Sequence, residues 1–247
     1  MNKQRFAVIV AGGIGSRAGA GMPKQFVELA GVPMIFHTLR AFADYDRKMK
    51  IVVVMNGEYM DVYARMCRER EFDVPHSIVE GGATRAESVR NGLAELGVSA
   101  AEGALDSNVA VAIHDAARPL VSRELIGRGF DAVEEGMGVV PVVKAINSLR
   151  RIISDGDRGR LSTLESRSVD RNDYVEVQTP QIFLYRDIWE AYGEAEDLKR
   201  FTDDASVAEA AGMKIGLFEG DHRNIKVTTP EDFMIAEKLL RMEGIKE

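Results

Sequence analysis

Residues 6–17 read Phe6-Ala7-Val8-Ile9-Val10-Ala11-Gly12-Gly13-Ile14-Gly15-Ser16-Arg17. The apolar half predicts a buried β-strand, and the glycines after it predict a tight turn. Because glycine has no Cβ atom, backbone N–H groups of this turn can close around a bulky anion. Arg17 and then Lys24 add the cations that a polyphosphate needs. We therefore predict an α/β fold with a nucleotide bound at the end of its first strand.

This glycine turn differs from two common nucleotide-binding motifs. No Gly-Lys-Ser/Thr sequence closes it, as a P-loop requires. For a dinucleotide fingerprint the third glycine falls too late, and no acidic residue ends a second strand about 20 residues further on. An NAD-linked oxidoreductase is therefore disfavoured, while a purely structural glycine turn stays open as an alternative.

Composition narrows the class of protein. The chain has 247 residues, 45% of them hydrophobic and 29% charged, with a net charge of −7. We expect a single domain over 1–247, and the acidic balance argues against bulk nucleic-acid binding. The single cysteine, Cys67, cannot form an internal disulfide, and no apolar run approaches the length of a membrane span. We expect a cytoplasmic enzyme that contacts neither nucleic acid nor a membrane, without a signal peptide.

Apolar runs alternate with helical patterns along much of the chain. Strands are expected at 6–11, 50–55, 76–79, 109–113 and 138–143, with helices near 34–45, 57–71, 84–98 and 122–135 between them. Helices are also expected near 187–196 and 203–211, strands near 214–219 and 224–228, and a last helix from about 230. Near-continuous apolar strands separated by amphipathic helices predict a mostly parallel sheet covered on both faces.

The alternation breaks at residues 144–173. This segment is rich in Arg, Ser and Asp and poor in large apolar side chains. One interpretation is a flexible surface loop, but loops of this length without structure of their own are usually functional or disordered.

Three further stretches carry chemistry. Asp115 and Arg118 follow the strand at 109–113, where Asp115 could help to hold Mg²⁺ or a substrate hydroxyl and Arg118 could contact a phosphate. The alternative is a structural ion pair between them. We expect His114 to be a packing or hydrogen-bonding residue, because a phosphate nucleophile is already ionised at pH 7 and needs no general base.

Gly81, Gly82 and Ser88 lie at the start of the helix expected near 84–98. Backbone amides there, with the Ser88 hydroxyl, can bind a pyrimidine edge or a ribose. Thr84 and Glu87 also have the spacing of a capping box, and both roles can coexist. On the late strand, Lys226 alternates with apolar neighbours, which fits either an edge-strand cation or an active-site cation.

Together these stretches resemble the 2-C-methyl-D-erythritol 4-phosphate cytidylyltransferases of the non-mevalonate isoprenoid pathway. The matching stretches, in family order, are 11–17, 23–25, Gly81-Gly82 with Arg85 and Ser88, 114–119, 169–171, Gln178-Thr179-Pro180-Gln181, 202–206 and 224–228. The resemblance implies a Rossmann-like nucleotidyltransferase fold with an extended dimerisation arm, for which 144–173 is the candidate. It also implies transfer of CMP from CTP to methylerythritol phosphate, assisted by Mg²⁺, in a homodimer.

The resemblance also implies roles for individual residues. Arg17, Lys24 and Lys226 match the catalytic cations. The CTP-binding set is Ala11, Gly12, Gly13, Gly15, Gly81, Gly82, Ser88 and Asp115, and Asp115 is also the candidate metal contact. The acceptor, a small sugar-alcohol phosphate, is expected to contact Arg118, Ser148, Arg171 and Thr179, with Arg171 reaching the neighbouring active site.

Two departures from the family pattern bear on specificity. Ala83 stands where many relatives carry Asp, so the base would be held mainly by backbone groups. The family's Asp-Thr pair at the arm entrance is missing, and Ser148 is the substitute hydroxyl for the acceptor phosphate. Ribitol 5-phosphate therefore stays open as an alternative acceptor. A non-catalytic CTP-binding module is a weaker alternative, because it would be expected to lose Lys24, Arg17 or Lys226.

Overall fold

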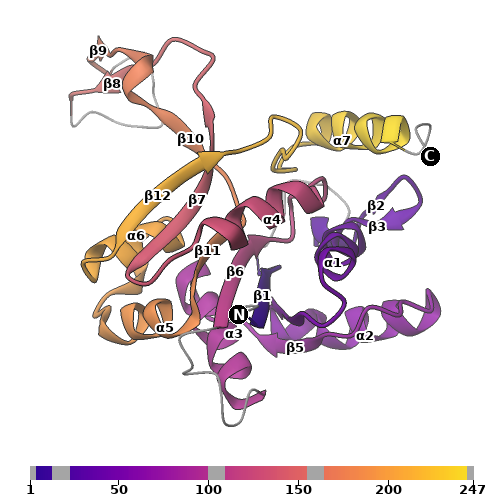
Figure 1. Ribbon diagram of the computed structural model, residues 1–247. Helices are drawn as coiled ribbons and strands as arrows, with labels where there is room; N and C mark the ends of the chain where they lie inside the picture. The colour runs from indigo at the N-terminus through magenta and orange to yellow at the C-terminus, as the bar shows by residue number, and fades with distance from the viewer. Residues whose placement is uncertain (1–3, 13–22, 100–108, 155–163, 244–247) are drawn as a thin grey trace.

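The computed structural model describes residues 4–12, 23–99, 109–154 and 164–243 (Figure 1). An eight-stranded sheet runs in the order β10-β7-β11-β6-β1-β4-β5, and β12 also pairs with β7. Its strands are β1 (Gln4–Val10), β4 (Lys50–Met55), β5 (Ser77–Glu80), β6 (Val109–Asp115), β7 (Met137–Lys144), β10 (Val175–Val177), β11 (Gln181–Leu184) and β12 (Lys214–Glu219). The helices are α1 (Met34–Tyr45), α2 (Met60–Glu69), α3 (Arg85–Ser99), α4 (Arg123–Ala132), α5 (Tyr185–Glu194), α6 (Asp204–Ala210) and α7 (Pro230–Glu243).

The prediction of a mostly parallel α/β sheet is confirmed. β1 lies between β4 and β6 and is parallel to both, and β5 and β12 are parallel to their neighbours. The sequence analysis missed β11, which lies between β6 and β7 and is antiparallel to both. β11 runs directly into α5 at Tyr185, so no turn signal separates its short apolar run from the helical pattern.

Helices cover both faces of the sheet, and alternate side chains of each central strand point to opposite faces. Ala7 and Ile9 of β1 pack with α1 and α4, whereas Phe6 and Val8 pack with α3 and α5. Both faces therefore need apolar residues, which explains the continuous apolar run of β1. A smaller cluster joins α7 to the segment around Val227. In the part of the chain that the structure describes, no helix is both long and apolar enough to span a bilayer.

The segment at 144–173 extends away from the sheet (Figure 1). The chain leaves at the end of β7, forms an antiparallel pair of short strands, β8 (Arg150–Ile152) and β9 (Ser166–Ser168), and returns along β10. Val175 of β10 pairs with Lys144 of β7, so the two ends of the segment lie side by side. We call residues 144–173 the arm. Ile146 is 67% exposed and Ile153 55% exposed, so the arm leaves apolar side chains uncovered in the single chain.

The strand predicted at 224–228 is wrong. These residues form an irregular extended loop, in which the Val227 N–H donates to the Ala117 carbonyl at 2.8 Å. Because Ala117 lies in the turn after β6 and not in a strand, the pairing does not continue as a ladder. The helix predicted at 57–71 also divides, into a short 3₁₀ turn, η3 (Gly57–Tyr59), followed by α2. Two further short strands, β2 (Glu28–Leu29) and β3 (Val32–Pro33), pair with each other before α1.

Candidate active site

A cavity of about 220 Å³ lies at the carboxyl ends of β1 and β6. This is the edge of a parallel sheet at which ligands of open α/β folds bind. Seven residues predicted from the sequence line it: Ala11, Gly12, Lys24, Gly82, Ser88, Asp115 and Lys226. Residues from five separate stretches of the chain therefore meet at one place, as expected of a nucleotide site.

Other predicted residues lie elsewhere. Gly81 is next to the lining, with its N–H donating to the Met55 carbonyl at 2.8 Å. Ser148 and Arg171 are exposed on the arm and do not line the cavity of their own chain. Gly13, Gly15 and Arg17 lie outside the described residues.

The described start of the glycine turn is held on both sides. The Ala11 N–H donates to the Val54 carbonyl at 2.7 Å, and the Gln25 side-chain amide donates to the Ala11 carbonyl at 2.5 Å. The polar groups of Ala11 are thus satisfied within the protein. Gly12 is less crowded, since a Cβ atom added there would meet its nearest atom, the Ser88 Oγ, at 3.5 Å.

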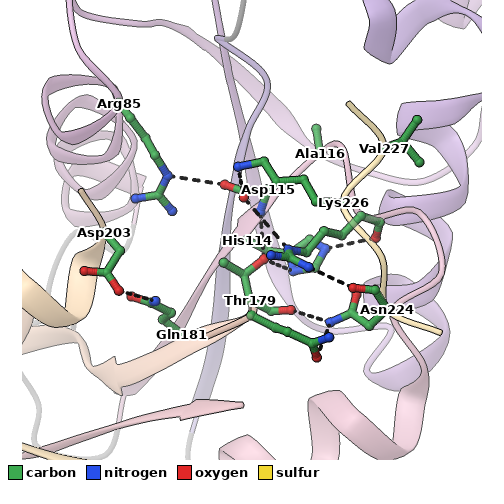
Figure 2. A network of polar contacts seen from close by, with 12 residues as sticks. Arg85, His114, Asp115, Ala116, Thr179, Gln181, Asp203, Asn224, Lys226 and Val227 are labelled. Atoms are coloured by element: carbon green, nitrogen blue, oxygen red, sulfur yellow. Dashed lines mark hydrogen bonds and ion pairs between the residues drawn. The ribbon is translucent and has the colours of Figure 1, made fainter. Parts of the chain in front are cut away.

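Two lysines reach the same wall of the cavity from distant parts of the chain. The Lys24 Nζ donates to the Val227 carbonyl at 2.8 Å. The Lys226 Nζ lies 2.7 Å from the Asp115 Oδ2, as Figure 2 shows. Lys24 follows the glycine turn, whereas Lys226 lies on the irregular loop before α7. The first of these contacts ties the Lys24 side chain directly to the loop that carries Lys226, so both ammonium groups face one ligand space.

Asp115 is the acidic residue around which these cations gather. Its carboxylate is close to Arg85 Nε at 3.2 Å, to Lys226 Nζ at 2.7 Å and to Arg118 Nε at 3.9 Å. Burial alone would raise the pKa of this carboxyl group, but Arg85, Lys226 and Arg118 outweigh burial and hold the pKa of Asp115 well below its usual range. Asp115 is therefore ionised at neutral pH.

His114, beneath the cavity, is buried and hydrogen-bonded at both ring nitrogens. Its Nε2 lies 3.2 Å from the Arg118 carbonyl, which can only accept, so Nε2 carries the proton. The Nδ1 then accepts from the Thr179 hydroxyl at 2.9 Å, and Thr179 Oγ1 accepts from the Asp115 N–H at 3.2 Å (Figure 2). Burial lowers the pKa of His114 to about 3, in agreement with the packing and hydrogen-bonding role expected for it.

Arg118 and Thr179 contact the protein rather than the cavity. The Arg118 Nη1 donates to the Asn224 carbonyl at 2.8 Å, and the Asn224 side-chain amide donates to the Thr179 carbonyl at 2.8 Å. Both contacts support the loop that carries Lys226. The ion pair considered as the structural alternative is also present, with the Arg118 Nε 3.9 Å from the Asp115 Oδ2. Contact of Arg118 or Thr179 with an acceptor stays a prediction.

The segment before α3 has the predicted capping box. The Thr84 N–H donates to the Glu87 carboxylate at 3.0 Å, and the Glu87 N–H donates to the Thr84 hydroxyl at 3.1 Å. The Ser88 hydroxyl accepts from the Gly82 N–H at 3.1 Å and donates to the Thr84 carbonyl at 2.9 Å. A Cβ atom added to Gly82 would lie 2.3 Å from the Glu87 Cβ, so this close approach requires glycine. Ser88 and the capping box together fix the backbone that borders the cavity.

Sequence reasoning did not assign a functional role to Arg85, Asp204 or Tyr192. The Arg85 guanidinium lines the cavity and forms a bidentate pair with Asp204, at 3.0 and 2.8 Å. The Tyr192 hydroxyl donates to the same carboxylate at 2.7 Å. These three residues come from α3, α6 and α5, so only the tertiary fold brings them together; the presence of Arg85 and Asp204 in two of the matching stretches was the available signal.

Comparison with known proteins agrees with this geometry. The family model for 2-C-methyl-D-erythritol 4-phosphate cytidylyltransferase (IspD) matches residues 6–242. The chain belongs to this family. Proteins of that name from Bacteroides fragilis and Porphyromonas gingivalis are each 42% identical to it, over 96% and 97% of this chain and 99% of theirs. A crystal structure of the Thermus thermophilus protein of that name aligns with a TM-score of 0.72 at 29% identity, covering 98% of this chain and 100% of that one.

Family membership confirms the resemblance and the nucleotidyltransferase fold expected from the sequence. A structure titled 4-diphosphocytidyl-2C-methyl-D-erythritol synthase aligns with a TM-score of 0.75 at 29% identity, over 96% of this chain and 99% of that one. The family is one of nucleotidyltransferase enzymes, so the chain is that of a cytidylyltransferase.

Proposed function

We propose that this protein transfers the cytidylyl group of CTP to 2-C-methyl-D-erythritol 4-phosphate. A phosphate oxygen of the acceptor forms a bond to the α-phosphorus, and the bond from that phosphorus to the bridging oxygen of the β-phosphate breaks. Pyrophosphate leaves with the electron pair, and 4-CDP-2-C-methyl-D-erythritol is the other product. The main observation that supports the proposal is that Lys24 and Lys226 lie at one wall of a cavity bordered by a glycine turn.

The two lysines supply charge where the reaction needs it. In phosphoryl-type transfers, positioning and charge neutralisation contribute most of the rate enhancement. Lys24, with Arg17, would neutralise the leaving pyrophosphate, and Lys226 would contact the α-phosphate and the attacking phosphate. The acceptor phosphate is ionised at neutral pH, which agrees with a buried neutral His114 that takes no part as a base.

The nucleotide base would lie against the segment that leads into α3. Gly81, Gly82 and Ser88 present backbone and hydroxyl groups there, and Ala83 in the cavity wall adds no polar side chain. Recognition of cytosine by backbone groups is therefore the expected mode. The turn with Ala11, Gly12, Gly13 and Gly15 would hold the phosphates.

The residues at the cavity fit a divalent cation held mainly by the substrate. Asp115 is the carboxylate in the described lining, and Mg²⁺ commonly binds through one or two carboxylates together with phosphate oxygens. Asp115 would contribute one ligand, with the phosphates of CTP supplying others. Such an ion would neutralise negative charge on the phosphate oxygens.

We further propose a homodimer formed through the arm, in the cytoplasm. The exposed Ile146 and Ile153, with Tyr174 at 46% exposure next to the arm, are apolar surface that a second copy would cover. In that dimer Arg171 and Ser148 would contact the acceptor phosphate at the partner's cavity, where Arg118 and Thr179 are the further candidate contacts. The single half-buried Cys67 agrees with a reducing compartment.

Pyrophosphate release from CTP and Mg²⁺ tests the proposed function, with methylerythritol phosphate and ribitol 5-phosphate assayed side by side. We expect turnover with the methylerythritol substrate, the acceptor in the names of the relatives. Turnover with ribitol 5-phosphate alone would contradict the acceptor while leaving the CTP site intact. Turnover with neither would favour the binding-module alternative.

A further inference from the structure

Arg85, the first residue of α3, lies between two carboxylates that belong to different parts of the fold. On one side it makes the bidentate pair with Asp204. On the other side its Nε donates to the Asp115 Oδ1 at 3.2 Å, as Figure 2 shows. Bidentate arginine–carboxylate pairs fix orientation as well as charge. The guanidinium plane is thus set by Asp204, and its Nε–H points to Asp115.

The Asp204 carboxylate is a firm anchor for this arrangement. Its side chain is 0% exposed, and the Tyr192 hydroxyl donates to Oδ1 at 2.7 Å. Burial alone would lower the pKa of Arg85, but Asp204 and Asp115 outweigh burial and raise it above its usual value. The positive charge of Arg85 therefore persists across the working range of pH.

Asp115 uses its two oxygens in different directions. The Oδ1 atom faces Arg85, and the Oδ2 atom lies 2.7 Å from the Lys226 Nζ. The Lys226 side chain is 44% exposed and lies on an irregular loop, so its own backbone does not fix where the ammonium group points. A lysine side chain has many rotamers, and ordering it costs conformational entropy. The direction of Asp115 Oδ2 therefore sets the position of this cation.

We propose that Arg85 is a positioning residue: held by Asp204 and Tyr192, it orients Asp115 and, through Asp115, the ammonium group of Lys226. A cation set in place before the substrate arrives stabilises a transition state without reorganisation. The inference rests on the proposed function, because it takes Lys226 as the cation beside the reacting phosphates. It extends the active site to α5, which carries Tyr192, and to α6, which carries Asp204.

The test removes the charge of Asp204 while keeping its shape, with Asp204→Asn. The matched control is Asp46→Asn, which removes the carboxylate paired with Arg5 at 3.2 Å, away from the cavity. We expect Asp204→Asn to lower kcat about 10- to 100-fold with the KM for CTP changed by less than about 3-fold. Asp46→Asn should leave kcat unchanged. An unchanged kcat in Asp204→Asn, or a raised KM for CTP with normal kcat, would overturn the proposal.

A double-mutant cycle with Lys226→Ala separates positioning from general loss of structure. If Arg85 acts through Lys226, Asp204→Asn should add less than about 2-fold to the defect of Lys226→Ala. Equal fold losses in both backgrounds would overturn the proposal. Tyr192→Phe, which removes only one hydrogen bond to Asp204, should give the same pattern at about 2- to 5-fold, and serves if Asp204→Asn does not fold.

A crystal structure of Asp204→Asn, or of Tyr192→Phe, gives a readout that does not depend on activity. We expect the Asp115 Oδ2–Lys226 Nζ distance to increase from 2.7 Å to beyond the ion-pair limit of about 4 Å. An unchanged contact would overturn the proposal even if the wild type turned over normally. Absence of turnover in the wild type, by contrast, contradicts the proposed function. The distance then still tests whether Arg85 positions Lys226 through Asp115.

Discussion

The cavity and the arm differ in how far their side chains are buried and paired within a single chain. At the cavity, Asp115 is 8% exposed and contacts three cations of its own chain. On the arm, Ile146 is 67% exposed, and Arg171 is exposed with its Nη1 donating to the Ile146 carbonyl. One chain can thus hold the charged groups of the cavity in place by itself. The arm leaves apolar side chains exposed in the single chain, which agrees with the proposed homodimer.

The largest expected effect comes from removing a cavity cation. Lys226→Ala and Lys24→Ala should each lower kcat about 10²- to 10³-fold, because the charge is lost where negative charge develops in the transition state. Steady-state pyrophosphate release measures this. Lys199→Ala is the control, since Lys199 is exposed on the surface away from the cavity. Normal turnover in either cavity variant would remove that lysine from the mechanism.

A second effect concerns acid stability of the buried region beneath the cavity. The pKa of His114 is lowered to about 3, so between pH 6.5 and 3 the unfolded chain binds a proton that the folded chain does not. Stability should therefore fall as pH decreases, by about 2 kcal/mol from this group between pH 7 and pH 5. Urea unfolding at both pH values measures the loss.

The matched variant for that experiment is His114→Gln, which keeps a polar side chain but cannot titrate. It should lose that share of the pH dependence, while the contributions of His37 and His76, whose pKa values burial also lowers, remain. An identical pH dependence in the variant and the wild type would contradict a neutral buried His114.

The smallest expected effect is a steric one at Gly82, in the segment that we propose lies against the nucleotide. Gly82→Ala places a Cβ atom 2.3 Å from the Glu87 Cβ, so the segment must shift. We expect the KM for CTP to rise about 10-fold, equivalent to about 1.4 kcal/mol, with a smaller change in kcat. Gly193→Ala in α5 is the control, because nothing lies within 4 Å of the added atom. Equal KM values in the two variants would exclude Gly82 from the CTP site.

The buried parts of the fold were the most predictable from sequence. The strand at β1 and the helices α1, α3 and α4 follow from apolar periodicity, since both faces of the sheet must be covered. The capping box of Thr84 and Glu87 follows from local spacing alone. Ala11, Gly12 and Asp115 were predictable because strand ends of a parallel sheet share one edge. Lys226 does not follow a strand, and only the resemblance to the family assigned it to the site.

The remaining features depend on tertiary contacts. β11 lies antiparallel between β6 and β7, which follow each other in the sequence pattern. The loop at 224–228 is irregular, and its Val227 N–H donates to the Ala117 carbonyl. The pairing of Arg85 with Asp204 joins residues 119 positions apart. No spacing rule connects them, so the series of ion pairs from Asp204 through Arg85 and Asp115 to Lys226 is visible only in the folded structure.

Complementation between two inactive variants tests most directly whether a complete active site needs two chains. Lys226→Ala and Arg171→Ala chains with different tags can be co-expressed and the mixed dimer purified through both tags. If Arg171 serves the partner's cavity, one of the two sites in the mixed dimer is intact, and we predict about half of wild-type turnover. Each variant alone should be nearly inactive. A mixed dimer as inactive as its parents would contradict an active site shared between the cavity of one chain and the arm of the other.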